Sequence, residues 1–116
     1  MTSEQIAWLA GLLEGEGYFC LQTKRLKSPT KPRGVYPKIV FVSTDKDICD
    51  RVSALFGTSP NYVGPRKDHY KPVWRALKVG TGASEILRLI LPYMGQRRRE
   101  KIEDILYRAK LFSLVK

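Results

Sequence analysis

The chain has few of the residues that hold disulfide-linked or zinc-bound domains together. It contains two cysteines, Cys20 and Cys49, and a single histidine, His69, among 116 residues. The cysteines do not form a CxxC pair, and a structural zinc ion needs four Cys or His ligands. We therefore expect neither a disulfide scaffold nor a zinc site, and we interpret both cysteines as small, half-buried residues.

The sequence also lacks long apolar runs. No stretch approaches the roughly 18 residues that a membrane-spanning helix needs. Residues 1–5 show neither the basic start nor the apolar segment of a secretory signal. Hydrophobic residues still make up 43% of the chain, which suits a single globular domain over residues 1–116. We expect an intracellular protein without a membrane partner, in a bacterial or phage cytoplasm or in an organelle.

Acidic residues are missing from two long segments. The chain has 21 Lys and Arg against 11 Asp and Glu, a net charge of +10. No acid lies between Glu16 and Asp45, and Asp68 is the only one between Arg51 and Ser84. Such segments favour a surface that lies against phosphate groups, as in nucleic-acid-binding proteins.

Hydrophobic periodicity predicts alternating helices and strands. Ser3 is expected to cap a first helix that stops at Gly15 or Gly17 in the left-handed conformation, and Asp45 to cap a second. The helices are predicted at residues 3–17, 45–56, 83–91 and 96–114, and the strands at 18–24, 35–44, 61–66 and 70–79. This order predicts an α+β domain, a four-stranded antiparallel sheet with helices on one face.

The uncovered face of that sheet is predicted to be basic and to read base edges in the major groove of DNA. Its polar strand positions are Gln22, Lys24, Lys38, Arg66 and Lys78. In the fourth strand, either Arg75 or Trp74 could point outward, and the sequence pattern leaves both choices open. Further DNA-binding candidates are Arg25, Lys27, Lys31 and Arg33 for the outer half-site, with Lys67 and Arg75.

The first predicted helix ends in acids. Its sequence, Leu-Ala-Gly-Leu-Leu-Glu-Gly-Glu-Gly over residues 9–17, places Glu14 and Glu16 where a helix carries partial negative charge. This placement is unfavourable unless a divalent cation binds there, because such ions take carboxylate and carbonyl oxygens. The small residues Ala7, Ala10 and Gly11 would let a second helix approach closely, so two copies could pair about a two-fold axis.

This segment resembles the LAGLIDADG motif of the homing endonucleases. The motif matches at Leu9, Ala10, Gly11, Leu12 and Gly17, with acids at both acidic positions. The predicted order of elements is also similar to the αββαββα fold of that family. The resemblance implies a homodimer that cleaves both strands of a long pseudo-palindromic DNA target with Mg²⁺ or another divalent cation such as Mn²⁺. The implied dimer contact comprises Ala7, Leu9, Ala10, Gly11 and Leu13.

The resemblance also implies roles for individual residues. Glu16 corresponds to the metal-binding catalytic carboxylate, the Gly15 carbonyl to a further metal ligand, and Glu14 to a supporting acid. The family more often has aspartate at both acidic positions. The longer glutamate side chains here would shift the bound metal and so affect the efficiency of cleavage.

Two more positions resemble active-site places of the family. Asp45 would lie near the metal or its water, although it could equally serve as the cap of the second helix. Arg97 is the candidate catalytic cation, and Arg98 is its rival. A solvated arginine run is the alternative explanation for both.

Other classes of protein stay open on the sequence. A DNA- or RNA-binding protein of the same fold that does not cut, such as a maturase acting on intron RNA, is the main alternative. A structural RNA-binding protein fits the charge but not the acidic helix end. A membrane-surface protein would need an amphipathic basic helix with aromatic anchors, which the chain lacks.

Overall fold

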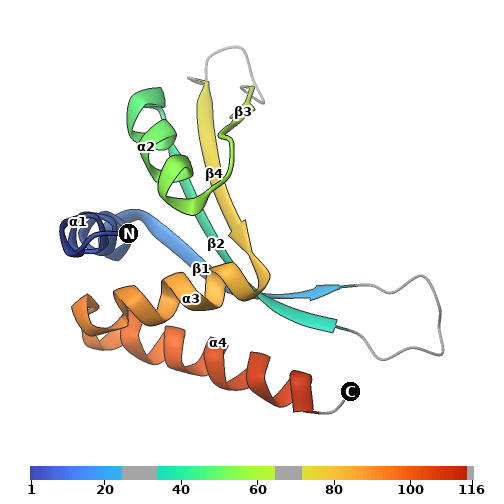
Figure 1. The fold of residues 1–116 in the computed structure, drawn as a ribbon. Coiled ribbons are helices and arrows are strands. Elements are labelled where there is room, and N and C mark those ends of the chain that lie inside the picture. The colour runs from blue at the N-terminus through green and yellow to red at the C-terminus, as the bar shows by residue number, and fades with distance from the viewer. Residues whose placement is uncertain (25–33, 65–71, 115–116) are drawn as a thin grey trace.

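A computed structural model describes residues 1–24, 34–64 and 72–114 of the chain. The elements follow one another as α1 (Ser3–Glu16), β1 (Gly17–Lys24), β2 (Gly34–Ser43), α2 (Lys46–Phe56), β3 (Asn61–Val63), β4 (Val73–Val79), α3 (Gly80–Ile90), the 3₁₀ turn η1 (Leu91–Tyr93) and α4 (Gln96–Leu114). Figure 1 shows this arrangement.

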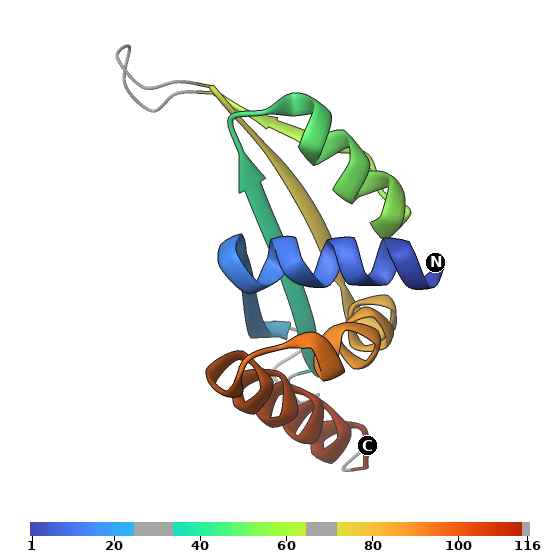
Figure 2. The ribbon, with the colours of Figure 1, turned by 90° about the vertical axis from the view of Figure 1, so that its left-hand side faces the viewer.

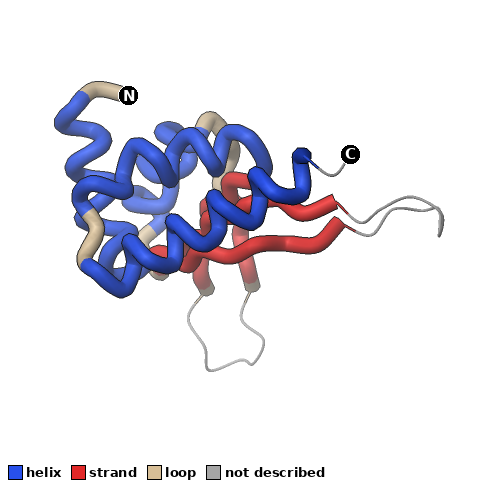
Figure 3. The backbone as a smooth tube through the Cα atoms, turned by 90° about the horizontal axis from the view of Figure 1, so that it is seen from below, coloured by secondary structure: helices blue, strands red, loops and turns tan. Residues whose placement is uncertain are grey.

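The four strands form one antiparallel sheet in the order β1-β2-β4-β3. The helices lie on one side of it (Figure 3), and α1 crosses β2 and β4 with α2 on one flank and α3 and α4 on the other (Figure 2). The predicted α+β class and the antiparallel sheet with helices on one face are both confirmed.

The N-cap of helix α1 lies one residue earlier than predicted. Thr2, rather than Ser3, is the N-cap, and its Oγ1 accepts a hydrogen bond from the Gln5 backbone N–H at 3.1 Å. The Gln5 side chain accepts a hydrogen bond from the Thr2 N–H at 2.8 Å and completes a capping box. Ser3 was the wrong choice because glutamine at position 5 is the third helical residue only if the cap is Thr2.

The end of α1 also differs from the prediction. The helix ends at Glu16, and its C-cap Gly17 is extended, with φ −77° and ψ 154°, rather than left-handed. A Cβ atom on Gly17 would lie 2.7 Å from the Leu13 carbonyl oxygen and 3.0 Å from the Leu13 Cβ. Glycine is therefore needed here for close approach, since the chain passes from helix to strand without a loop.

The other helix boundaries depend on different residues. Gly57 ends α2 in the left-handed conformation, with φ 73°, directly after the predicted last residue, Phe56. Helix α3 begins at Gly80, three residues before the predicted start at Ala83, because β4 runs into it without a connecting loop. Pro92 does not simply stop this helix, since the chain continues through η1 around it.

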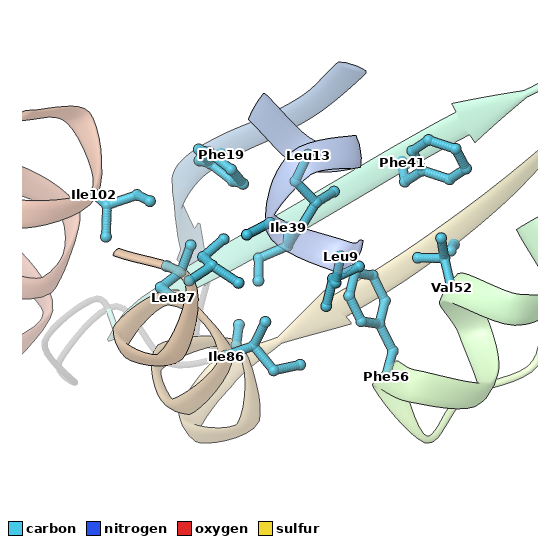
Figure 4. Close-up of a cluster of buried hydrophobic side chains, with 14 of the residues drawn as sticks. Leu9, Leu13, Phe19, Ile39, Phe41, Val52, Phe56, Ile86, Leu87 and Ile102 are labelled. Carbon is cyan, nitrogen blue, oxygen red and sulfur yellow. The ribbon is translucent and has the colours of Figure 1, made fainter. Parts of the chain in front are cut away.

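The core lies between the sheet and the helices, as Figure 4 shows. Strand residues Phe19, Ile39 and Phe41 alternate inward as the two-residue period predicts, and they meet Leu9 and Leu13 of α1. Each large side chain buried in this way contributes about 1.5–3 kcal/mol to folding. The inner face of α2 is formed mainly by Cys49, Val52, Ser53 and Phe56, with Ile48 and Leu55 only partly buried.

The two cysteines are free thiols in different surroundings. Cys20 is half-buried, as predicted, whereas Cys49 is fully buried. Desolvation raises the pKa of the Cys49 thiol, so this residue stays protonated and behaves as part of the core.

We predict that Gly17→Ala lowers the free energy of unfolding by about 1–3 kcal/mol, because the new methyl group would press on the Leu13 backbone. Chemical denaturation monitored by circular dichroism measures this change. An unchanged midpoint would contradict the close contact between α1 and β1.

Candidate active site and nucleic-acid interface

The acidic end of α1 lies at the edge of the structure where β1 begins. Glu16 and Gly15 are exposed, Glu14 is half-buried, and no basic residue occupies the last turn. The last carbonyl groups of a helix have no intrahelical partner, so the Gly15 carbonyl belongs to the set that can bind an external cation. One chain therefore presents one free carboxylate and nearby carbonyl oxygens at a single point.

Arg98 supplies the positive charge that α1 lacks at its own C-terminus. Its Nη1 donates a hydrogen bond to the Gly17 carbonyl oxygen at 2.6 Å, and its guanidinium carbon lies 5.2 Å from the centre of the Phe19 ring. A cation at a helix C-terminus is favourable, and the aromatic ring adds a cation–π contact. Of the two rival arginines, Arg98 is thus the one that contacts the end of the motif segment.

Arg97 lies beside it in a basic pocket. This open pocket of about 320 Å³ is lined by Gly17, Tyr18, Phe19, Arg97, Arg98 and Lys101. Among the described residues the two ion pairs are Lys46–Asp50 and Arg108–Asp104, so no carboxylate pairs with the three cations of the pocket. Lys101 was not among the predicted site residues, although its spacing of four residues from Arg97 on a helix could have indicated it.

Glu14 is sheltered between α1 and the start of α4. A Cβ atom on Gly95 would lie 2.9 Å from Glu14 Oε1, and Glu14 Oε2 is buried with no hydrogen-bond partner among the described residues. The two acids of the motif are therefore unequal: Glu16 is open to a ligand, while Glu14 faces the chain's own fold.

The predicted dimer contact divides into two groups. Leu9, Ala10 and Leu13 are fully buried in the core of the chain itself, so the structure corrects their assignment to an outer face. The 3.6-residue period turns them inward. Ala7 and Gly11 are exposed, so their place in the dimer contact stays a prediction, and Gly15 continues their stripe at a spacing of four residues. Cβ atoms on Gly11 and Gly15 would meet no atom of residues 1–24, 34–64 or 72–114 within 4 Å, so packing within this part of the chain does not require glycine at either position.

The face of the sheet opposite the helices carries part of the predicted DNA-binding set. Gln22 and Lys38 lie on it, and Lys38 Nζ donates a hydrogen bond to Gln22 Oε1 at 3.5 Å. The open question on β4 is resolved, since Trp74 packs against the core and Arg75 lies opposite the exposed Val42 on the free face. None of the four strands contains an acidic residue.

Lys78 is on the wrong side for the predicted role. It pairs with buried Ile39 and shares the inner face with buried Ala76, because the phase of β4 is the one set by Trp74. Its side chain lies along α3, where a Cβ atom on Gly82 would overlap with Lys78 Cε. Leu77 and Val79, the neighbours of Lys78 in β4, lie on the free face where Lys78 was expected.

Seven predicted DNA-binding positions lie wholly or partly outside the described residues. The backbone of Lys24 is in β1, opposite Gly34, but the position of its side chain is not among the described parts of the chain. The remaining six lie outside the described residues: Arg25, Lys27, Lys31, Arg33, Arg66 and Lys67.

Asp45 is not brought to the end of α1. It is the exposed N-cap residue of α2, although its side chain makes no capping hydrogen bond; its backbone N–H donates to Ser43 Oγ at 3.0 Å. Gly17 pairs with Phe41, so Asp45 lies four residues, or about 13 Å of extended strand, further along. Within the described residues, no three Asp, Glu, His or Cys side chains form a metal-binding group.

None of the helices in the described part of the chain is long and apolar enough to cross a membrane.

Comparison with known proteins places this geometry in a structural class. No protein-family model and no curated protein sequence matches the chain. Solved structures do: the homing endonuclease I-CvuI in complex with its target in the presence of Ca matches with a TM-score of 0.70 and 20% identity, over 95% of this chain and 68% of I-CvuI. The intron-encoded homing endonuclease I-CeuI complexed with DNA matches with a TM-score of 0.66 and 18% identity, over 97% of this chain and 56% of I-CeuI.

A third match is the LAGLIDADG meganuclease I-AabMI bound to uncleaved DNA, with a TM-score of 0.69 and 14% identity. It covers 91% of this chain and 38% of I-AabMI, so the chain spans about two thirds or less of these proteins. The chain has the fold of the LAGLIDADG homing endonucleases, and the resemblance inferred from residues 9–17 is confirmed at the level of the fold.

We predict that Arg98→Met lowers the free energy of unfolding by about 1–2 kcal/mol, because the end of α1 loses its charged hydrogen bond while the apolar stem is kept. Arg97→Met, at the exposed neighbouring position, is the control and should change stability by less than about 0.5 kcal/mol. Equal effects of the two substitutions in urea denaturation would contradict the distinct role of Arg98.

Proposed function

We propose that the chain is a LAGLIDADG homing endonuclease whose homodimer cuts both strands of a pseudo-palindromic DNA target with Mg²⁺ or a similar divalent cation. The observation that carries the proposal is the exposed Glu16 at the end of a helix whose outer stripe is made of small residues. The fold shared with DNA-bound homing endonucleases supports the choice of substrate.

The small residues of α1 support the pairing of two chains. A glycine inside a helix costs about 1 kcal/mol relative to alanine, and none of the described residues fills the space beside Gly11 or Gly15. A second copy of α1 would use that space, because glycine lets two helix backbones approach closely. The 38% coverage of I-AabMI, a chain more than twice as long, is consistent with two such units making one enzyme.

The donor set at the end of α1 fits a hard divalent cation. Two-fold pairing would bring together two Glu16 carboxylates and two Gly15 carbonyl groups, and Mg²⁺ favours such oxygen ligands with water filling the other positions. When bound, a divalent ion supplies an activated water and charge neutralisation for phosphodiester hydrolysis.

The basic pocket completes the site on the protein side. Arg97 is exposed and forms no ion pair with the described residues, so its guanidinium can contact the scissile phosphate and stabilise the charge that develops on it. Arg98, bound to the Gly17 carbonyl, positions the end of α1 beside that phosphate. Gln22, Lys38 and Arg75 hold the DNA across the free face.

We predict that Glu16→Gln retains DNA binding and reduces cleavage by about 100-fold or more, because the amide keeps the shape but loses the charge that holds the cation. Glu4→Gln, at the opposite end of α1, is the matched control. Cleavage of the uninterrupted form of the site in which the gene is inserted, with Mg²⁺, measures the effect. Binding without any cleavage by the unmodified chain would instead indicate the non-cutting alternative.

We predict that Gly11→Leu converts the dimer to a monomer, since the larger side chain would fill the space that a second α1 needs. Sedimentation equilibrium measures the mass, and circular dichroism checks that the fold is kept. Glu103→Leu, which adds the same side chain to an exposed position of α4, should stay dimeric. A dimer unaffected by Gly11→Leu would place the contact elsewhere.

A further inference from the structure

The free face of the sheet has an apolar centre formed by Tyr18, Val40, Val42, Leu77 and Val79. The register places these side chains beside one another: Tyr18 is opposite Val40, and Val40 is opposite Leu77. Tyr18 is 62% exposed, Val42 44% and Val79 45%. Because the helices lie on the other side of the sheet (Figure 3), no described element of the chain covers this patch.

A patch of exposed apolar side chains on a sheet indicates a binding surface. The charges around it favour nucleic acid over a protein. Lys38 lies opposite Val79, Arg75 lies opposite Val42, and the pocket that Tyr18 lines contains Arg97. The strands carry no acid to repel phosphate. The surface is thus apolar in the middle and cationic at its rim, which matches base edges flanked by two sugar-phosphate backbones.

Valine and leucine side chains cannot form hydrogen bonds with base edges. The one apolar group that a standard base presents in the major groove is the C5-methyl group of thymine. We infer that the apolar centre reads thymine methyl groups, and that Arg75, Lys38 and Gln22 around it read hydrogen-bonding groups or phosphates. This inference rests on the proposed DNA-binding function and adds a preference in sequence to it.

The location of the patch indicates which base pairs it reads. Tyr18 directly follows Gly17, whose carbonyl oxygen is bound by Arg98, and Glu16 precedes them. The apolar centre therefore lies next to the acidic end of α1, so the thymines it contacts are those closest to the cleaved bonds. Base pairs farther along each half-site would lie beyond it.

The inference can be tested with the full chain and a library of random DNA duplexes, in Ca²⁺ or Mg²⁺. Bound duplexes are selected and sequenced, and thymine should be enriched at positions close to the centre of the target. The best duplex is then made with deoxyuridine in place of thymidine at these positions. Loss of each contacted methyl group should weaken binding about fourfold, whereas replacement at outer positions should have no effect.

Val42→Ser connects the preference to the patch, because serine removes both methyl groups of valine and leaves a hydroxyl. This variant should bind the thymidine duplex and the deoxyuridine duplex equally at the position that Val42 contacts. Leu111→Gln, on α4 and 42% exposed, is the control and should keep the fourfold difference.

The outcomes separate the two proposals. If no duplex is selected at all, the proposed DNA-binding function fails, and the readout fails with it. If duplexes are selected but deoxyuridine binds as well as thymidine, the readout alone is wrong. A change of oligomeric state in Val42→Ser, seen by sedimentation, would show that the patch contacts protein and would likewise overturn the inference.

Discussion

The contact between Gly17 and Leu13 is the constraint on which the rest of the site depends. Helix α1 passes into β1 without a loop, and only a residue without a side chain permits the strand to leave the helix so closely. This junction places Glu16 at the start of the sheet and Tyr18 on its free face. Arg98 reinforces the same point through the Gly17 carbonyl, so two elements far apart in sequence hold the acid in position.

The charges of the molecule are separated in a way that suits its proposed task. The strands carry no acid, the basic pocket lies where α4 begins, and carboxylates are concentrated on the helices. An exposed carboxylate beside such a surface would repel phosphate unless a cation lies between them. The acidic end of α1 is therefore understandable as a cation site within a nucleic-acid-binding face, and as a poor choice for stability alone.

Much of the fold could be predicted, because apolar residues recur with clear periods. The alternation around Ile39 and Phe41 identified the inner face of β2, and Gly57 marked the end of α2. The prediction was less good where period and composition conflict. In β4, Trp74 and Arg75 are both half-buried, so the pattern alone did not settle the phase, and Lys78 was assigned to the wrong face. Leu9, Ala10 and Leu13 were assigned to the dimer contact from the resemblance, but the core of the chain buries them.

The sequence by itself determined the element order, the excess of positive charge and the presence of two acids at the end of a glycine-rich helix. These properties are local, since they depend on neighbouring residues and on counting. Tertiary structure decided that Arg98 rather than Arg97 contacts Gly17, that Lys101 joins them, and that the free face is apolar at its centre. Those properties depend on strand register and on the packing of α4 against β1, which bring together residues about 80 positions apart and leave no trace in local sequence.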